Sequence, residues 1–488
     1  MKIACFADLH LTDNFNTVKL QVLRWAMAEA CKRKVNCIAL LGDLTATGTM
    51  RQTEKILAEL ASCQIDIFST PGNAEYRHDA SGKAAAFFDL PPTEKSGIFM
   101  MNTAFNTPTE DDLIRLAALP ENAGKVLFTH APPRLWESRA QELLLQAQAV
   151  KAVTFVLAGH SHIDSDGIMR GLDPDKAAGN PPGFEIISTS ASGSWEREKI
   201  TMPGIDPAGW NVDERAKLHS IFGISAMYEP VKGLQDAVEL GIPHVELRFM
   251  PEFPPELPGA IALWRKSGGK TLSMHLVNLD SDASPYLAES VDKAIEYGCD
   301  RVTLHVPKVT AAKFPEEQDK LLANFDKFVA KLLDHGIVIG IENLHTTDGK
   351  RTFETRNFGC CIEECRQWIT LLREKYQTDK IGFHCDIGHA RNNAPVSAVE
   401  NLSDYYCELG ALINGWHFHQ VVQEAGGKFK NHRELTGFFT RLISLGGFLM
   451  EYRQHRFNDA PVFLEVTTPD GGVTSYREMT ALLKGGSI

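Results

Sequence analysis

In the N-terminal part of the chain, polar side chains with metal-binding chemistry follow successive apolar, strand-like stretches. They are Asp8, His10, Asp43, Asn73, His130, His160 and His162. Because the ends of neighbouring strands meet at one edge of a sheet, we expect these side chains to converge. Carboxylate, imidazole and amide ligands together suit divalent Mn, Fe or Zn ions. Asp43 could bridge two such ions, a pair that generates hydroxide and clamps a phosphoryl oxygen.

The C-terminal part repeats this arrangement with a second set of polar residues at strand ends. The set is Glu246, His275, His305, Glu342, Asn343, Asp386, His389, His417, His419 and Glu465. Strand residues two apart point to the same face, so His417 and His419 share one. Carboxylates and imidazoles together form an oxygen-rich site for one or two divalent ions of Mn, Mg, Co or Zn.

These side chains need strands that end side by side, and the hydrophobic pattern predicts such strands. Short apolar runs alternate with helical stretches along the chain, which indicates an α/β protein. From residue 220 onward, eight strand-like runs, from IFGISAMY to VFLEVTT, are separated by helical stretches. Eight βα units predict a (β/α)8 barrel with its site at the C-terminal ends of the strands. We therefore expect an N-terminal domain over 1–195, a linker over 196–218 and a barrel over 219–488.

Composition and charge limit the classes of function. The 488 residues carry 50 Lys and Arg against 62 Asp and Glu, a formal net charge of −12. Neither half is basic, which makes nucleic acid a less favoured partner, since phosphate backbones need clusters of positive charge. Ten cysteines without framework spacing fit a reducing compartment, and the CCIEEC stretch indicates a helix start. The sequence shows neither a signal peptide nor a long apolar run. We expect a cytoplasmic protein without a membrane segment, and a homo-oligomer is an open alternative.

Over about residues 1–195 the chain resembles the calcineurin-like metallophosphoesterases. The motifs DLH, GDL, GNAE, THAPP and GHSH stand in the order of that family. The resemblance implies an α/β sandwich that holds two divalent metal ions. It implies one ion bound by Asp8, His10, Asp43 and His162, and another bound by Asp43, Asn73, His130 and His160.

Ala74 departs from the family pattern, which is Gly-Asn-His-Asp/Glu. The family histidine contacts the phosphoryl group and protonates the leaving oxygen, whereas alanine has no titratable group. Loss of a general acid costs typically about 10²–10⁴-fold in rate, and leaving groups that need no protonation should lose least. Three explanations are open: a deliberate inactivating substitution, another donor such as His78 or a metal-bound water, or drift towards a binding function.

The stretches IEN, DIGH, WHFHQ and FLEV, within residues 219–488, resemble the xylose-isomerase-like barrels. This superfamily includes sugar isomerases and epimerases and the endonuclease-IV-type nucleases. The resemblance implies the shared metal ligands Glu342, Asp386, His419 and Glu465. In the epimerase branch, Glu342 and Glu465 would also act as base and acid on a sugar carbon, and His389 would bind substrate.

The nuclease branch would use more histidines. His275 and His305 would bind a second ion, and His389 with an Asp-x-His pair would bind a third. In this chain Lys430 replaces the aspartate of that pair while His432 remains, so a one- or two-metal barrel is the expectation. The candidates for a second ion or for substrate are His275, His305, His417 and His432.

Three functions follow from the two halves. The first is a bifunctional metal-dependent enzyme, in which a phosphomonoester or phosphodiester hydrolase is fused to a sugar (phosphate) isomerase or epimerase. Its substrate would be a phosphorylated small molecule or sugar. The second is a nucleic-acid phosphodiesterase fused to an abasic-site endonuclease-like barrel. The third is a metal-binding protein with an inactive phosphoesterase domain. Acidic composition and the altered Asp-x-His pair favour the first.

Overall fold

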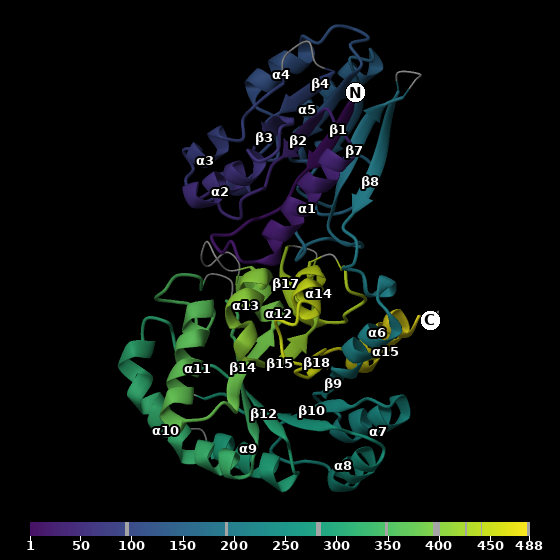
Figure 1. Ribbon diagram of the computed structural model, residues 1–488. Coiled ribbons are helices and arrows are strands. Elements are labelled where there is room, and N and C mark those ends of the chain that lie inside the picture. The colour runs from purple at the N-terminus through teal and green to yellow at the C-terminus, as the bar shows by residue number, and fades with distance from the viewer. Residues whose placement is uncertain are drawn as a thin grey trace. The chain divides into compact units, whose positions relative to one another are not determined.

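The computed structural model describes residues 1–92, 97–190, 194–279, 285–346, 350–393, 401–424, 427–440 and 442–485 (Figure 1). The chain divides into two compact units. The first comprises Met1–Ile205 together with Phe439–Met450, and the second comprises Asp206–Phe438 together with Glu451–Ile488. The segment Phe439–Met450 therefore belongs to the first unit, although barrel elements flank it in the sequence.

Two β-sheets form the centre of the first unit. One has the strand order β3-β2-β1-β7-β8 and the other the order β4-β5-β6. Their strands are β1 (Lys2–Phe6), β2 (Cys37–Leu41), β3 (Asp66–Thr70), β4 (Ile98–Met101), β5 (Lys125–Thr129), β6 (Val153–Ala158), β7 (Gly183–Thr189) and β8 (Trp195–Thr201). The strands β1 to β3 are parallel, as are β4 to β6, whereas β7 and β8 pair antiparallel. The predicted α/β fold of this part is confirmed.

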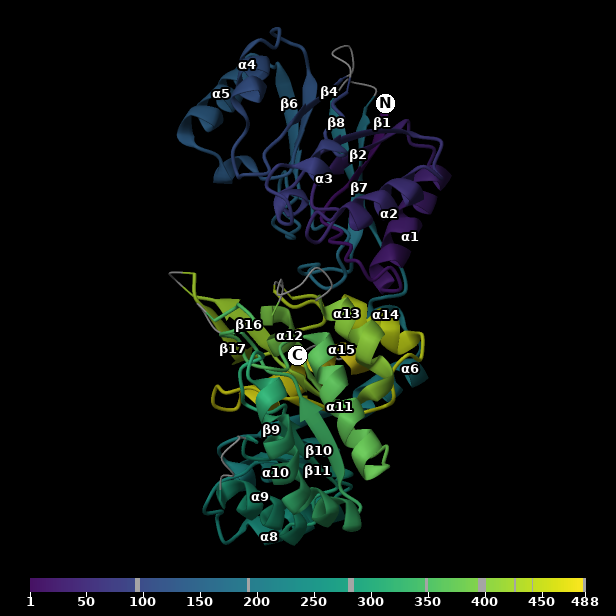
Figure 2. The ribbon, with the colours of Figure 1, turned by 90° about the vertical axis from the view of Figure 1, so that its left-hand side faces the viewer.

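Helices flank both sheets of the first unit. They are α1 (Val18–Lys32), α2 (Met50–Leu60), α3 (Lys83–Ala86), α4 (Glu110–Ala117) and α5 (Ser138–Ala149), with the 3-10 helices η1 (Ala74–Tyr76) and η2 (Pro133–Leu135). In Figures 1 and 2, α1 and α2 lie beside the five-stranded sheet, and α4 and α5 beside the three-stranded sheet. A parallel strand that is covered on both faces is apolar throughout, and β2 (CIALL) is buried at every residue.

The second unit contains a closed barrel of parallel strands in the order β10-β11-β12-β13-β14-β15-β18-β9. The strands are β9 (Phe222–Ala226), β10 (His244–Arg248), β11 (Thr271–His275), β12 (Arg301–His305), β13 (Val338–Glu342), β14 (Ile381–Asp386), β15 (Ile413–Phe418) and β18 (Val462–Leu464). Every neighbouring pair is parallel. These strands are the eight apolar runs of the sequence, so the predicted (β/α)8 barrel is confirmed.

Helices and one hairpin complete the elements of the C-terminal part. The helices are α6 (Val212–Ser220), α7 (Pro230–Leu240), α8 (Leu257–Lys266), α9 (Pro285–Glu296), α10 (Phe314–Asp334), α11 (Ile362–Tyr376), α12 (Ile387–Asn393), α13 (Leu402–Leu409), α14 (Gly446–Arg453) and α15 (Gly471–Lys484). The 3-10 helices are η3 (Pro207–Gly209) and η4 (Gly410–Leu412), and the hairpin pairs β16 (Gln420–Gln423) with β17 (Phe429–Arg433). Helix α11 begins inside CCIEEC, with Cys361 as its N-cap, so the expected helix start is correct.

The stretch expected as a linker, 196–218, has regular structure of its own. It contains most of β8, which pairs with β7 along its length, then η3 and most of α6. The two compact units divide between Ile205 and Asp206, so strand pairing carries the first unit beyond the expected boundary at residue 195. In the part of the chain that the structure describes, none of the helices combines the length and apolar character needed to cross a bilayer.

Candidate metal centres

The seven N-terminal candidate ligands lie just beyond the C-terminal ends of β1, β2, β3, β5 and β6. Five of them have a left-handed backbone: Asp8 (φ 53°), His10 (48°), Asp43 (52°), His160 (68°) and His162 (52°). Residues other than glycine adopt this conformation rarely, and such strain concentrates at functional sites. The backbone is therefore held in an unfavourable form at the positions that aim these side chains.

Two groups of ligand atoms result, each with its atoms within 4.8 Å of one another. They are Asp8, His10 and His162, and Asp43, His130 and His160. Asp43 stands between them, because its Oδ2 lies 3.6 Å from Nε2 of His10 and its Oδ1 lies 3.4 Å from Nε2 of His130. Oδ1 of Asn73 is 3.1 Å from Nε2 of His130. The structure thus brings all seven candidates together, with Asp43 in the bridging position.

The orientation of His130 fits a metal ion in the second group. Its Nδ1 lies 2.9 Å from the carbonyl oxygen of Leu41, so Nδ1–H donates there and the Nε2 lone pair faces the oxygens of Asn73 and Asp43. Electron-rich atoms that face one another in this way are suited to a cation between them. A metal-binding histidine usually has its other nitrogen bound to an oxygen acceptor, as His130 has.

Burial keeps His10, His160 and His162 neutral, which is the form that binds metal ions. It holds the pKa values of His10 and His162 well below the ordinary histidine value, with Lys176 adding to the effect. Burial also lowers the pKa of His160 to about 4, helped by His130, Arg77 and Arg134. Burial and the neighbouring Asp43 raise the pKa of Asp8, a cost that a bound cation would offset.

Glu75 holds the two loops that carry Asp43 and Asn73. Its carboxylate accepts hydrogen bonds from the backbone N–H groups of Asp43 (2.9 Å), Thr45 (2.9 Å) and Gly72 (2.8 Å), and from the Thr45 hydroxyl (2.9 Å). Gly72 is required here because a Cβ atom would lie 2.3 Å from Oδ1 of Asp43. Gly72 therefore allows this loop to approach Asp43 closely.

Ala74 is fully buried at the start of η1. Its backbone N–H donates a 2.7 Å hydrogen bond to Oδ1 of Asp43, but its methyl group offers no proton. His78, the alternative donor considered from the sequence, is exposed and belongs to neither ligand group. Its backbone N–H donates to the carbonyl oxygen of Thr47 at 2.7 Å.

A buried charged cluster behind the first group was not identified from the sequence. Lys19 is fully buried, and its Nζ donates to Oδ2 of Asp173 at 2.9 Å and to the carbonyl oxygen of His10 at 3.3 Å. Asp173 in turn donates its backbone N–H to the carbonyl oxygen of Asp8 at 2.8 Å. The apolar periodicity of α1 could not reveal this role, because Lys19 and Asp173 are 154 residues apart in the chain.

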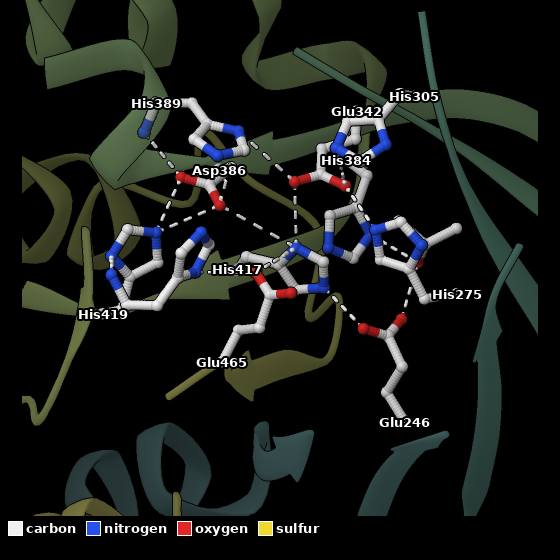
Figure 3. A network of polar contacts seen from close by, with 12 residues as sticks. Glu246, His275, His305, Glu342, His384, Asp386, His389, His417, His419 and Glu465 are labelled. Atoms are coloured by element: carbon white, nitrogen blue, oxygen red, sulfur yellow. Dashed lines mark hydrogen bonds and ion pairs between the residues drawn. The ribbon is translucent and has the colours of Figure 1, made fainter. Parts of the chain in front are cut away.

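In the barrel, the candidate residues lie in and just beyond the C-terminal ends of the strands, as Figure 3 shows. Three groups of ligand atoms form there. They are His275, His305 and Glu342; Glu342, Asp386, His417 and Glu465; and Asp386, His419, His432 and Glu465. The first and second groups share Glu342, and the second and third share Asp386 and Glu465, so the three are linked in a row.

The structure divides the predicted barrel ligand set differently. His417, rather than His419, joins Glu342, Asp386 and Glu465, while His419 joins His432. Nε2 of His419 lies 3.1 Å from each carboxylate oxygen of Asp386. The physical reason is the position of each histidine along the strand. His417 lies within β15, whereas His419 follows the last residue of β15, Phe418.

His417 is oriented towards the centre of the second group. Its Nε2 lies 2.6 Å from Oε1 of Glu246 and donates there, while its Nδ1 lies 3.1 Å from Oε1 of Glu342 and 3.3 Å from Oε2 of Glu465. Figure 3 shows this imidazole between the three carboxylates. Although burial opposes protonation, Glu465, Glu246 and Glu342 raise the pKa of His417 well above its ordinary value. The centre of the group therefore favours positive charge, as a metal site does.

The first and third groups have similar features. Nδ1 of His275 lies 3.0 Å from the carbonyl oxygen of Leu276, which leaves Nε2 facing Oε2 of Glu342 at 3.1 Å. Despite burial, the carboxylate of Glu465 raises the pKa of His432 to about 9, and Nδ1 of His432 lies 3.2 Å from it. Both groups thus place an imidazole nitrogen against a carboxylate.

His389 and Lys430 lie outside these groups. Nδ1 of His389 is 3.0 Å from the carbonyl oxygen of Asn343, and its backbone N–H donates to Oδ1 of Asp386 at 2.7 Å. Its ring centroid lies 5.5 Å from that of His432, so it borders the third group. Lys430 pairs with Glu424 at 2.6 Å instead. Lys430 therefore contributes no atom to these groups, whereas His419 belongs to the third.

His384 is fully buried beneath the ligand groups of the barrel. Its ring centroid lies 4.1 Å from that of His417, and Nη2 of the buried Arg301 lies 2.9 Å from its Nδ1. The hydroxyl groups of Ser273 and Thr303 donate to Oε2 of Glu246, each at 2.7 Å. Buried polar residues thus support His417 from below.

Comparisons with known proteins give a match to one family model. Residues 1–164 match the family model of the calcineurin-like phosphoesterases. A comparison with curated proteins finds no match.

Solved structures similar to the chain each cover 54% of it. Endonuclease IV from Thermus thermophilus is 18% identical, with 99% of its chain covered and a TM-score of 0.37. A 3-keto-D-glucoside 4-epimerase from E. coli is 12% identical, with 99% covered and a TM-score of 0.39. A xylose isomerase domain protein from Alicyclobacillus acidocaldarius subsp. acidocaldarius is 17% identical, with 100% covered and a TM-score of 0.38. The N-terminal part of this protein matches the calcineurin-like phosphoesterase family over residues 1–164, and its C-terminal part is a closed (β/α)8 barrel.

Proposed function

We propose that the N-terminal domain is a two-metal hydrolase of phosphoric esters. The observation that carries this proposal is the pair of ligand groups on either side of Asp43. Mn, Fe or Zn fits their mixture of imidazole, carboxylate and amide ligands. When bound, a pair of such ions lowers the pKa of a water molecule and neutralises phosphoryl oxygens.

The protein's own residues determine which esters react well. Asp43 is held by the N–H of Ala74 and by the loop that Glu75 organises, so the ligand framework does not depend on the side chain at position 74. Position 74 offers no proton to a leaving oxygen. We therefore infer substrates whose leaving groups depart without protonation, such as aryl phosphates, and slow turnover of alkyl phosphates.

For the barrel, we propose a second hydrolytic centre with more than one divalent ion. The three linked ligand groups support this proposal, because a one-metal isomerase needs only the central group. Carboxylates that belong to two groups, such as Glu342, suit neighbouring ions that act on one phosphoryl group. The third group contains His419 together with His432, the remaining residue of the altered Asp-x-His pair. The net charge of −12 favours a small phosphate ester over nucleic acid.

A sugar isomerase or epimerase is the second candidate for the barrel, and one observation favours it. Glu342 and Glu465 both approach Nδ1 of His417, at 3.1 and 3.3 Å, so two carboxylates meet at one ligand atom. In an isomerase these two would remove and return a proton on a sugar carbon, and His389 would bind substrate.

Metal counting on the full chain tests the proposal. The protein is stripped with a chelator, reloaded with Mn²⁺ or Zn²⁺ and freed of excess ions, and bound metal is measured by mass spectrometry for wild type, Asp43→Ala and Glu342→Ala. We expect Asp43→Ala to lose metal from the N-terminal domain and Glu342→Ala to lose metal from the barrel. A double variant with both substitutions should lose most of the bound metal. More than one ion lost with Glu342→Ala supports the multi-metal barrel, and a single ion lost contradicts it. Unchanged metal content in Asp43→Ala contradicts the N-terminal site and supports a disabled domain.

Activity measurements on the same variants separate the reaction classes. Hydrolysis of p-nitrophenyl phosphate and bis(p-nitrophenyl) phosphate should persist in part in each single variant and disappear in the double variant. Incubation with ketohexoses in D₂O tests isomerisation, because proton removal next to the carbonyl exchanges carbon-bound hydrogen for deuterium. If this deuterium exchange occurs in wild type and is lost in Glu342→Ala, the barrel is an isomerase and the hydrolytic assignment is wrong.

A further inference from the structure

A pocket of about 620 Å³ lies along helix α5 and the edge strand β6 of the N-terminal domain. Its apolar lining includes Pro133, Leu144, Leu145, Phe155, Val156 and Ile168. Two lining residues lie in the segments that carry candidate ligands, because Pro132 follows His130 by two residues and Ser165 follows His162 by three. These segments connect the pocket lining with both ligand groups along the chain.

Arg134 connects this pocket with the ligand groups. It lines the pocket, and its Nη2 donates a 3.1 Å hydrogen bond to Oγ of Ser161. Ser161 stands between the ligands His160 and His162 in the chain. The Arg134 side chain is exposed, and a guanidinium has five N–H donors in a geometry that matches phosphoryl oxygens. Further donors of Arg134 are thus available to an anion at this boundary.

We propose that this pocket is a subsite for the apolar part of a phosphate ester, and that Arg134 binds a phosphoryl oxygen at its entrance. The assignment rests on the proposed hydrolysis of phosphoric esters by the N-terminal domain. The substrate class is an aryl phosphate, with the phosphoryl group at the ligand groups and the aryl group between α5 and β6. Leu145, which is 64% exposed in the absence of a ligand, would be covered by that group.

Two features of the domain agree with this substrate class. An aryl group gives a leaving oxygen that needs little protonation, which suits the alanine at position 74. The pocket also contains polar side chains, including Gln148 and Asp166, beside its apolar wall. Pockets with an apolar wall and a few polar groups are typical of small-molecule sites.

Binding of phosphonates tests the subsite without turnover, because their carbon–phosphorus bond is not hydrolysed as an ester. Calorimetry on the Mn²⁺-loaded full chain compares inorganic phosphate, methylphosphonate and phenylphosphonate. Burial of the phenyl ring should make phenylphosphonate bind at least ~10-fold more tightly than methylphosphonate. Leu145→Asp should abolish that preference, and Arg134→Gln should weaken both phosphonates to a similar degree. Asp43→Ala should abolish the phenyl preference and the N-terminal share of this binding, whereas any binding at the barrel should remain, which ties the preference to the N-terminal groups.

Matched controls come from the same surface. Arg139 is an exposed arginine of α5 that pairs with Glu110 and does not line the pocket, so Arg139→Gln should leave all affinities unchanged. Ile114, 59% exposed on α4, is the control for Leu145, and Ile114→Asp should keep the phenyl preference.

The calorimetry distinguishes a failure of the proposed subsite from a failure of the proposed hydrolytic function. If phosphate and methylphosphonate bind in an Asp43-dependent manner but phenylphosphonate binds no more tightly, the subsite is wrong and the proposed function stands. A phenyl preference that survives Leu145→Asp also contradicts the subsite. If none of the three anions binds to the metal-loaded protein, the proposed function is wrong and the subsite with it.

Discussion

The backbone N–H of Ala74 donates a 2.7 Å hydrogen bond to Oδ1 of Asp43, the carboxylate between the two N-terminal ligand groups. The backbone at position 74 therefore helps to orient a metal ligand, whereas its methyl side chain supplies no proton. The two contributions of this position are separable, because the hydrogen bond comes from the main chain and survives substitution of the side chain.

Restoring an imidazole at position 74 should increase hydrolysis. We expect Ala74→His to raise kcat for an alkyl phosphate well above tenfold, and for p-nitrophenyl phosphate by less, because p-nitrophenolate departs without protonation. The measurement is steady-state kinetics on the metal-loaded protein. Ala74 is fully buried, so Ala74→Gln serves as the control for filling the space without a titratable group. Equal gains in both variants, or no gain in either, would show that a missing general acid does not limit turnover.

Glu75→Ala should destabilise the N-terminal domain. Three buried N–H groups, of Asp43, Thr45 and Gly72, would lose their acceptor, at a cost of about 1–3 kcal/mol each. We expect the free energy of unfolding of this domain to fall by about 3–9 kcal/mol. Glu75→Gln keeps one acceptor oxygen and should lose less. Urea unfolding of the metal-free full chain measures both, and an equal loss in the two variants would contradict the role of the shared carboxylate.

Glu246 should control metal affinity in the barrel without binding the metal. Its carboxylate accepts the Nε2–H of His417 and so directs Nδ1 towards Glu342 and Glu465. Loss of such an outer partner typically weakens metal binding about 10–100-fold. We expect Glu246→Ala to weaken binding at the barrel by this factor and to leave the N-terminal ions in place, as metal titration would show. Glu296→Gln, an exposed carboxylate change on α9, is the control. Unchanged barrel affinity in Glu246→Ala would refute the role of Glu246.

His219 should make the barrel unit less stable in mild acid. Burial, with a contribution from Lys484, lowers its pKa to about 4, and its Nε2 lies 2.9 Å from the Thr480 hydroxyl. An unfolded histidine has a pKa of about 6.5, so between about pH 6.5 and 4 the unfolded chain binds a proton that the folded chain does not. Stability therefore falls as pH decreases through this window. We expect His219→Gln to flatten that fall in urea unfolding, whereas the exposed His335→Gln should not. Parallel curves for wild type and His219→Gln would contradict this assignment.

The general arrangement of the N-terminal site was predictable because it depends on local patterns. Apolar runs indicated the strands, and polar residues at their ends, such as Asp8 and His130, indicated where side chains would meet. Parallel strands bring their C-terminal ends to one edge, so order along the chain becomes proximity in space. The same reasoning predicted the eight barrel strands and the edge at which Glu342 and Glu465 lie.

Tertiary structure decided what local patterns leave open. The two-residue period of a strand places His417 and His419 on one face, and only the depth of each along β15, relative to Glu342 and Asp386, shows which belongs to the central group. Lys19 meets Asp173, and Arg134 meets Ser161, through contacts across loops and strands that no local period encodes. The sequence by itself determined the fold class and the set of candidate ligands. Their grouping, their supporting partners and the adjoining pocket were decided by folding, because these depend on distances between segments far apart in the chain.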